Sequence, residues 1–264
     1  MRHLSWGFAI VVVLLVVVGP LLDRVVFPER EPGLEFVPKV GQVFHSASEG
    51  FTQRIIKREQ GLIWSELTLH PHAPGPPPHV HTTFPERFRV ERGTVSVRHG
   101  DEVVQLHAGE EFLVSPGVVH KPFNQTDQVA VVSGLLTPEY ALPERFGIFL
   151  SQAYGFFDAT PENGRPPRAL LQMSRFSPAY DSWLGGPPVA LQRAAYWVIG
   201  PIARLLGYRT YYTEYAPARV APRVGTPPNN EMQRTSQRQD GGSPQISVLY
   251  APGTRRRDCA IITV

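Results

Sequence analysis

The chain contains a single cysteine, Cys259, among its 264 residues. One thiol cannot close an intrachain disulfide, so a fold held together by cysteine bridges is excluded and cysteine usage does not reveal the redox compartment. Cys259 is also sixth from the end, which excludes a C-terminal prenylation motif. Because it lies in a loose tail far from the histidines, Cys259 is a poor candidate for a metal ligand or a nucleophile.

A basic stripe with interleaved aromatic side chains is also absent, although the net charge is +3 and the pI is about 9.1. Residues 222–264 hold six Arg against three acidic residues, and this difference accounts for the whole net charge. The remainder is near neutral, so we expect no nucleic-acid partner. The sequence has no internal repeat either, which favours one main domain with additional segments.

The chain does have a concentrated set of metal-binding side chains: His79, His81, Glu86 and His120. Alternate side chains of a β-strand share a face, so the imidazoles of His79 and His81 can point inward together. From Glu86 onward, apolar residues alternate with charged ones, which indicates a second strand with its ligand on the inner face. His120 lies 34 positions beyond Glu86, and a compact antiparallel barrel is the expected way to bring it back.

Two blocks around these residues resemble the two signature motifs of the cupin superfamily. The first block spans residues 75–93 with His79, His81 and Glu86, and the second spans residues 109–124 with His120 and Asn124. The resemblance implies a small jelly-roll barrel with a metal at its centre, and it does not specify the reaction.

Two turn positions depart from the family pattern. Ala73 stands where the first motif usually opens with glycine, and Ser115 stands where the second usually has proline. Both departures affect turns rather than ligands. Asn124 also begins a glycosylation acceptor sequence, but the cupin motif explains this asparagine better.

Three imidazoles and one carboxylate form a complete ligand set for one divalent transition metal. They suit Mn, Fe, Co, Ni, Cu or Zn better than Ca or Mg, and an octahedral site would keep positions open for water, oxygen or substrate. The resemblance implies Fe or Mn as the usual occupant, with Zn, Ni and Cu also compatible. A degenerate barrel that binds no metal is the alternative.

The longest apolar run lies at the N-terminus, at residues 6–22. Its 17 residues are at the short end of a membrane-spanning helix. We interpret the run as an uncleaved single-pass anchor, because no small-x-small cleavage site follows it; a cleaved signal peptide and a buried soluble helix are the alternatives. Positive charges flank the run on both sides, so the side of the membrane stays open.

The expected fold class is all-β: a cupin jelly-roll barrel with an N-terminal transmembrane helix and a helical C-terminal extension. The predicted parts are an anchor at 1–27, a linker at 28–42, the barrel at 43–137, the extension at 138–216 and a tail at 217–264. The tail is rich in Pro, Gly, Arg, Gln and Asn without a hydrophobic period, which indicates disorder.

The extension is predicted to contain helices at residues 144–157, 168–175 and 187–207, of which the last is strongly apolar. Three positions for the last helix are open: in the membrane interface, across the membrane, or packed on the barrel. In the interface, the rings of Tyr196 and Trp197 would lie at headgroup depth.

Two functions fit these features. The first is a membrane-anchored, metal-dependent oxidoreductase of the dioxygenase type, resembling quercetinase-like cupins and acting on a small organic substrate. The second is a non-catalytic module that binds or senses a metal or small molecule at the membrane. A dimerisation unit with a vestigial site is a weaker third, and the resemblance also implies a homodimer.

No catalytic residue can be assigned from the sequence. Glu66 and His70 are candidates for an acid or base beside the metal. Alternation predicts that the barrel interior is lined by Phe88, Val90, Val95, Val97, Phe112 and Val114. Such a lining would favour an apolar or aromatic substrate.

Overall fold

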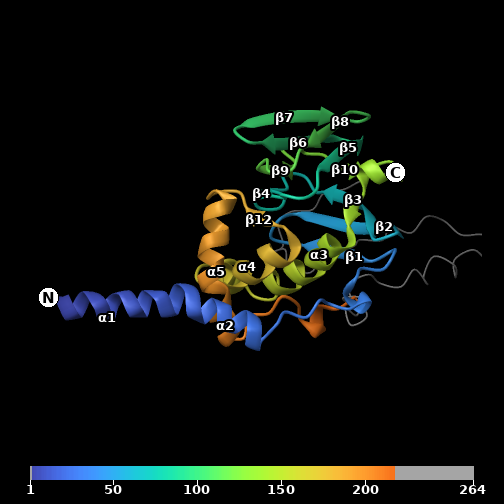
Figure 1. Cartoon of the computed structure of the whole chain (residues 1–264). Helices are drawn as coiled ribbons and strands as arrows, with labels where there is room; N and C mark the ends of the chain where they lie inside the picture. Colours follow the sequence, from blue (N-terminus) through green and yellow to red (C-terminus); the bar gives the residue numbers. More distant parts are fainter. Residues whose placement is uncertain (1, 218–264) are drawn as a thin grey trace, which may run out of the picture. The chain divides into compact units, whose positions relative to one another are not determined.

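A computed structural model describes residues 2–217 of the chain, and its centre consists of two antiparallel sheets (Figure 1). The first sheet has the strand order β1 (Val43–Ser46), β2 (Phe51–Glu59), β3 (Leu62–Leu69), β10 (Ala130–Ser133), β5 (Glu86–Arg92) and β8 (Glu111–Val114), and β11 (Leu142–Pro143) pairs with β3. The second has the order β12 (Trp183–Leu184), β4 (His79–Val80), β9 (His120–Phe123), β6 (Thr94–His99) and β7 (Glu102–His107). Apart from Pro217, the predicted tail lies outside the described residues.

The inner faces of the two sheets share one hydrophobic core. It contains Phe51 and Leu69 from the first sheet beside Val95 and Val97 from the second, all of them at most 1% exposed. Antiparallel sheets packed in this way fit the predicted jelly-roll. The prediction of a closed barrel is not met, since no strand pairing joins the two sheets into one continuous ring within residues 2–217.

Strands β2 and β3 form an antiparallel hairpin. Between them, Gln60 and Gly61 both adopt positive φ angles, of 51° and 78°. This is the backbone conformation that matches the twist of paired strands, and it explains the tight two-residue turn.

The C-terminal extension forms three helices, α3 (Glu144–Phe157), α4 (Arg168–Tyr180) and α5 (Val189–Leu205). The prediction ended the second of these helices at residue 175, but α4 runs through Pro178 and ends at Asp181 in the left-handed conformation, with φ of 52°. The helices and the sheets are connected, because β11 and β12 both come from the extension. Figure 1 shows α3 beside β1, and the two elements are in contact.

Helix α5 packs one face against the protein and exposes the other. Its buried positions are Gln192, Tyr196, Gly200 and Ala203, whereas Leu205 is 81% exposed. The interface alternative would place the ring of Tyr196 at headgroup depth, but this ring is buried within the protein. This ring is only 4% exposed and stacks on Trp183, with ring centroids 6.1 Å apart.

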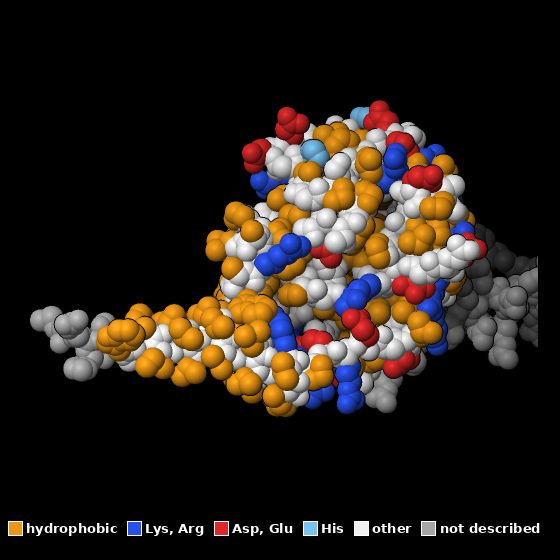
Figure 2. Space-filling view, in the orientation of Figure 1, with side chains coloured by type: hydrophobic (Ala, Val, Ile, Leu, Met, Phe, Trp, Pro, Cys, Tyr) orange, Lys and Arg blue, Asp and Glu red, His pale blue; other side chains and the backbone are white. Residues whose placement is uncertain are grey.

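The N-terminal run forms a helix in three parts, α1 (Arg2–Val13), the π-helical turn η1 (Leu14–Val18) and α2 (Gly19–Val26). Residues Trp6–Val26 form a stretch of 21 residues with a mean hydropathy of 2.5, which is long and apolar enough to cross a membrane. Hydrophobic side chains cover its length in Figure 2. A signal sequence has the same composition, so membrane attachment is part of the functional proposal.

Candidate metal centre

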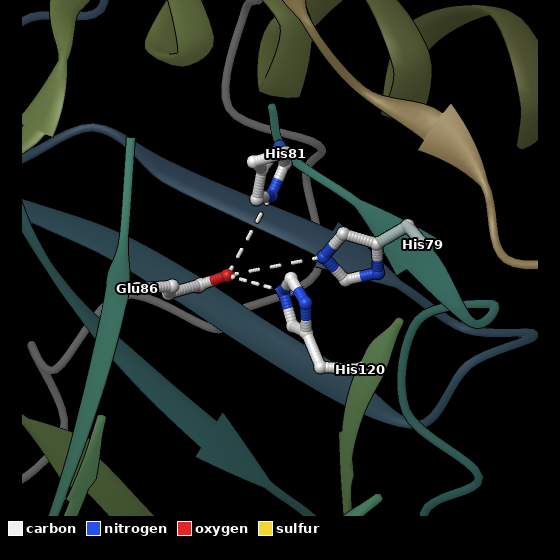
Figure 3. A group of neighbouring side chains, drawn as sticks. All are labelled: His79, His81, Glu86 and His120. Atoms are coloured by element: carbon white, nitrogen blue, oxygen red, sulfur yellow. Dashed lines mark hydrogen bonds and ion pairs between the residues drawn. The ribbon is translucent and has the colours of Figure 1, made fainter. Parts of the chain in front are cut away.

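Both sheets contribute to the cluster formed by the four predicted ligands (Figure 3). His79 and His120 are register partners on the neighbouring strands β4 and β9, and His81 directly follows β4. Glu86 begins β5 in the other sheet. One ligand atom from each of the four residues lies within 4.8 Å of the others. The fold therefore brings all four predicted residues to one point.

The three imidazoles converge on the carboxylate through the same ring atom. The Oε2 atom of Glu86 lies 2.9 Å from Nε2 of His120, 3.6 Å from Nε2 of His81 and 3.8 Å from Nε2 of His79. Three nitrogen donors and one oxygen donor, all facing a common centre, match the coordination preference of a divalent transition metal.

Backbone carbonyls fix the orientation of all three rings. The acceptors for the Nδ1–H groups are Pro77 for His79 at 2.8 Å, Asp181 for His81 at 2.8 Å, and Val118 for His120 at 2.9 Å. A carbonyl oxygen can only accept, so each neutral ring carries its proton on Nδ1 and presents the lone pair of Nε2 to the centre. Hydrogen bonds of this kind are the usual support of metal-bound histidine.

One atom of the cluster has no hydrogen-bond partner among the described residues. The Nε2 atom of His81 is buried and unpaired, although the His81 side chain is only 1% exposed. A buried polar atom without a partner costs about 1–3 kcal/mol. A bound metal ion would remove that cost, so the donor set fits such an ion.

The charges of the cluster are strongly coupled. Burial acts to raise the pKa of Glu86, but the hydrogen bond with His120 and the nearby rings of His79 and His81 hold it well below its ordinary value. Burial together with the nearby His120 lowers the pKa of His79 to about 4. Burial also opposes the charged form of His120, yet the hydrogen bond and the charge of Glu86 raise its pKa.

Asp181 supports the site in a way that the sequence did not indicate. Its backbone carbonyl accepts from His81, and its carboxylate accepts from the backbone N–H groups of Thr82 and Thr83, both at 2.7 Å. The hydroxyl groups of the same threonines donate to it at 2.6 and 2.7 Å. Asp181 thus holds the segment that connects His81 to Glu86.

Aromatic rings form the inner wall of the site. The ring of His81 stacks on Phe84 with centroids 4.3 Å apart and contacts the edge of Phe146 at 4.8 Å. The side chains of His79 and Glu86 are 16% and 17% exposed, against 1% for His81. The side of His79 and Glu86 is therefore the more exposed side of the cluster.

The predicted interior residues behave as expected. Phe88, Val90, Val95, Val97 and Val114 are at most 3% exposed, and Phe112 packs against them while partly buried.

The two candidates for an acid or base do not lie at the cluster in the way that the prediction requires. Glu66 forms an ion pair with Arg54 at 2.9 Å, and His70 is exposed to solvent. Neither has the buried position that proton transfer at the cluster would need.

The motif turns are ordered by specific contacts. Gly75 has a φ of 69°, and a Cβ atom there would overlap the carbonyl oxygen of Pro122. Asn124 is 2% exposed, and its side-chain amide donates to the carbonyl groups of His70 at 2.9 Å and Gln128 at 2.7 Å. Its burial explains why the motif needs an asparagine here, independently of any glycosylation.

Comparisons with known proteins agree with this architecture. Residues 65–136 match the family model described as Cupin domain, which supports the cupin superfamily for that part of the chain. A protein of Aspergillus clavatus named "Probable oxidoreductase patJ" is 31% identical over 165 residues, covering 57% of this chain. The match spans 49% of that relative, so this chain corresponds to about half of its length.

Solved structures with a similar arrangement are more distant. An oxalate oxidase shares 20% identity over 33% of this chain and 50% of its own, with a TM-score of 0.29. A cupin-2 domain containing protein from Shewanella frigidimarina shares 22% identity over 34% of this chain and 78% of its own, with a TM-score of 0.28. Likeness of this size says nothing about the reaction of this chain.

Proposed function

We propose that this protein is a membrane-anchored, metal-dependent cupin oxidoreductase in which His79, His81, Glu86 and His120 bind one divalent transition metal. The observation that carries the proposal is the convergence of four donor atoms within 4.8 Å, with each imidazole turned to present Nε2. The Cupin domain match and the relative named as a probable oxidoreductase support the same class of activity.

The metal would act as a Lewis acid and, if it is Fe or Mn, as a redox centre for a dioxygenase-like reaction. The residues of the chain would do the rest. The carbonyl acceptors orient the imidazoles, and Phe84 and Phe146 exclude water from one side of His81. The substrate class we propose is a small organic molecule with an apolar or aromatic part, entering beside His79 and Glu86.

Membrane attachment is the second part of the proposal. The helix at Trp6–Val26 has the length and hydropathy of a single-pass anchor, and most of it is exposed. Anchoring would keep the metal site close to a membrane surface, where apolar substrates concentrate.

Metal analysis of the full-length chain tests the central claim. The protein is purified in detergent without chelators, and its metal content is measured beside His81→Ala and His120→Ala. We expect about one Fe or Mn ion per chain, lost in both variants, because each removes one of four donors. His107→Ala is the matched control, since His107 is exposed and belongs to β7. Folded protein that takes up no metal after reconstitution would contradict the proposal.

A metal-binding or sensing module is the second candidate, and one observation favours it. The apolar rings that contact the cluster belong to Phe84, Phe88 and Phe146, none of which can transfer a proton. Oxygen consumption by the metal-loaded protein, measured with a panel of small aromatic and carboxylic compounds, separates the two. Tight metal binding without turnover would favour the sensing module.

A further inference from the structure

A charged cavity lies where the N-terminal helix meets the helical extension. Its volume is about 390 Å³, and it is bounded by the end of α2, the segment that follows it, and helices α4 and α5. The apolar stretch of the N-terminal helix ends at Val26, at the edge of this cavity. If the helix spans a membrane, the cavity therefore lies at the depth of the lipid headgroups.

The cavity is rich in guanidinium groups. Five arginines line it against three carboxylates, and the five are Arg24, Arg30, Arg145, Arg175 and Arg204. The surplus of positive charge is complementary to an anion. Arginine is also the side chain best suited to phosphate, because its planar fork binds two oxygens at once.

Arg175 gives the cavity a buried, incompletely paired donor. Its side chain is only 9% exposed, and its Nε atom has no hydrogen-bond partner among the described residues. Its other nitrogens contact the carbonyl group of Gly200 and the carboxylate of Glu29. A buried guanidinium of this kind gains from a further acceptor.

Glu29 occupies the place that a phosphate group would take. Its Oε1 atom is bound by both Arg175 and Arg204. Burial acts to raise the pKa of Glu29, but the two arginines lower it, so this carboxylate is a charged internal anion. Its side chain is 46% exposed, and its Oε2 atom accepts a hydrogen bond from the Thr210 hydroxyl at 3.3 Å.

An apolar groove of about 290 Å³ continues from the charged cavity, and both are lined by Asp23, Phe27 and Pro201. The groove runs between the N-terminal helix and α5, and its apolar lining includes Leu14, Leu22, Val26, Val198, Ile202 and Leu205. The two helices are held together there, since the indole N–H of Trp197 donates to the carbonyl group of Val16 at 2.8 Å. The guanidinium of Arg24 also lies 3.7 Å from the Trp197 ring centroid.

We infer that the charged cavity and the apolar groove together form a binding site for one anionic phospholipid. The phosphate group would bind Arg175 and Arg204 in place of Glu29, and one acyl chain would lie in the groove. A pocket that joins basic side chains to an apolar groove beside a membrane helix has the layout of a lipid headgroup site. The inference goes beyond the proposed activity and shares with it only the membrane attachment.

Lipid titration of the full-length chain in detergent tests this site. The probes are a phosphatidylglycerol, the phosphatidylcholine with the same acyl chains, glycerol 3-phosphate and inorganic phosphate, with binding followed by calorimetry. We expect saturable binding of phosphatidylglycerol at least about tenfold tighter than phosphatidylcholine. The soluble phosphates, which lack acyl chains, should bind much more weakly. Equal affinity for both lipids would overturn the inference, and so would soluble phosphates binding as tightly as phosphatidylglycerol.

Variants that change the charge of the cavity in opposite directions separate lipid recognition from folding. Arg204→Gln and Arg175→Gln should each weaken phosphatidylglycerol binding about tenfold, whereas Glu29→Gln should strengthen it because the competing carboxylate is gone. Arg54→Gln is the matched control, since Arg54 lies on β2 and pairs with Glu66. If Arg175→Gln unfolds, the variants at the partly exposed Arg204 and Glu29 still test the lipid site. Unchanged affinity in both Arg204→Gln and Glu29→Gln would overturn the inference.

The metal content of the same preparations keeps the two claims apart. Lipid binding without metal would refute the proposed oxidoreductase and leave the lipid site intact. Metal binding without lipid selectivity would refute the lipid site and leave the proposed oxidoreductase intact.

Discussion

The backbone carbonyl of Asp181 accepts a hydrogen bond of 2.8 Å from Nδ1 of His81, although 100 positions of sequence separate the two residues. The Asp181 carboxylate also binds the two threonines that follow His81. The C-terminal extension therefore reaches the metal centre directly and fixes one of its imidazoles. Partners of this kind commonly affect metal affinity as much as some ligands do.

Removing the Asp181 side chain should weaken metal binding without unfolding the protein. Asp181→Gly keeps the left-handed backbone, with φ of 52°, at no steric cost but loses the contacts to Thr82 and Thr83. We expect metal affinity about tenfold lower. The metal affinity of Asp181→Asn should lie between those of Asp181→Gly and the parent, because the asparagine amide oxygen can still accept some of these hydrogen bonds. The measurement is a competition titration with a chromophoric chelator.

Two comparisons complete the Asp181 experiment. Asp181→Ala should add a loss of about 1–2 kcal/mol in the free energy of unfolding, because alanine is strained in the left-handed region. Asp101→Ala, in the exposed turn between β6 and β7, is the control. An Asp181→Gly protein with full metal affinity would show that the carboxylate contacts to Thr82 and Thr83 do not support the candidate metal centre.

Gly75→Ala should strongly destabilise the fold. The position combines a φ of 69° with direct overlap between a Cβ atom and the carbonyl oxygen of Pro122, so the backbone of β9 would have to shift. We expect the free energy of unfolding to fall by about 3 kcal/mol or more. Gly100→Ala is matched in φ, at 62°, but has open space around its Cβ, so it should cost only about 1–2 kcal/mol. Urea unfolding measures both, and equal losses would contradict the steric argument.

Glu49→Gln should change how stability depends on pH. Burial and the nearby Asp158 raise the pKa of Glu49 from 4.5 to about 7, and its Oε2 atom is buried without a hydrogen-bond partner. Between these values the folded state binds a proton that the unfolded state has lost, so this group makes stability fall as pH rises from about 4.5 to about 7. Glutamine is neutral at every pH, so Glu49→Gln should avoid this loss of stability. At pH 8 it should exceed the parent in the free energy of unfolding by on the order of 2 kcal/mol.

The Glu49 measurement is urea unfolding at about pH 5 and pH 8 with a chelator present, so that metal does not contribute. Glu102→Gln, at an exposed position of β7, is the control. If Glu49→Gln were no more stable than the parent at the higher pH, burial would not destabilise the charged carboxylate of Glu49.

Metal affinity should rise with pH through the neutral range. Glu86 raises the pKa of His120 against the effect of burial, so the metal-free site keeps a proton there that an incoming metal must displace. His79, with its pKa lowered to about 4, has already lost its proton in this range and adds nothing to the pH dependence. Calorimetry in buffers of different ionisation enthalpy counts the released protons. Metal affinity that stays constant between about pH 5 and pH 8 would contradict this coupling.

Long periodic elements and the residues of the four-membered cluster could be predicted from the sequence, because both depend on local patterns. The alternation of residues in β5 and β8 fixed which side chains face inward, and α3 was predicted with the observed bounds. The four candidate ligands could be singled out because the motif spacing was close to that of the cupin family. Their actual convergence needed the tertiary fold.

The missed features depend on contacts between distant segments. Strand β12 has only two residues, and it is a strand because Trp183 pairs with Val80 rather than because of its composition. The helix predicted at residues 168–175 was too short, because α4 continues through Pro178 to Tyr180. For Glu66, the sequence could not reveal that Arg54 on the neighbouring strand would form an ion pair with it.

The pairing of β12 with β4 places Leu184 opposite His79, beyond all four ligands in chain order. During synthesis, all four candidate ligands are therefore made before β12, which pairs with the backbone at His79, and before Asp181, which accepts a hydrogen bond from His81. The supports of His79 and His81 are complete only after the extension has been synthesised, so the order of the elements along the chain also sets the order in which this site can be assembled.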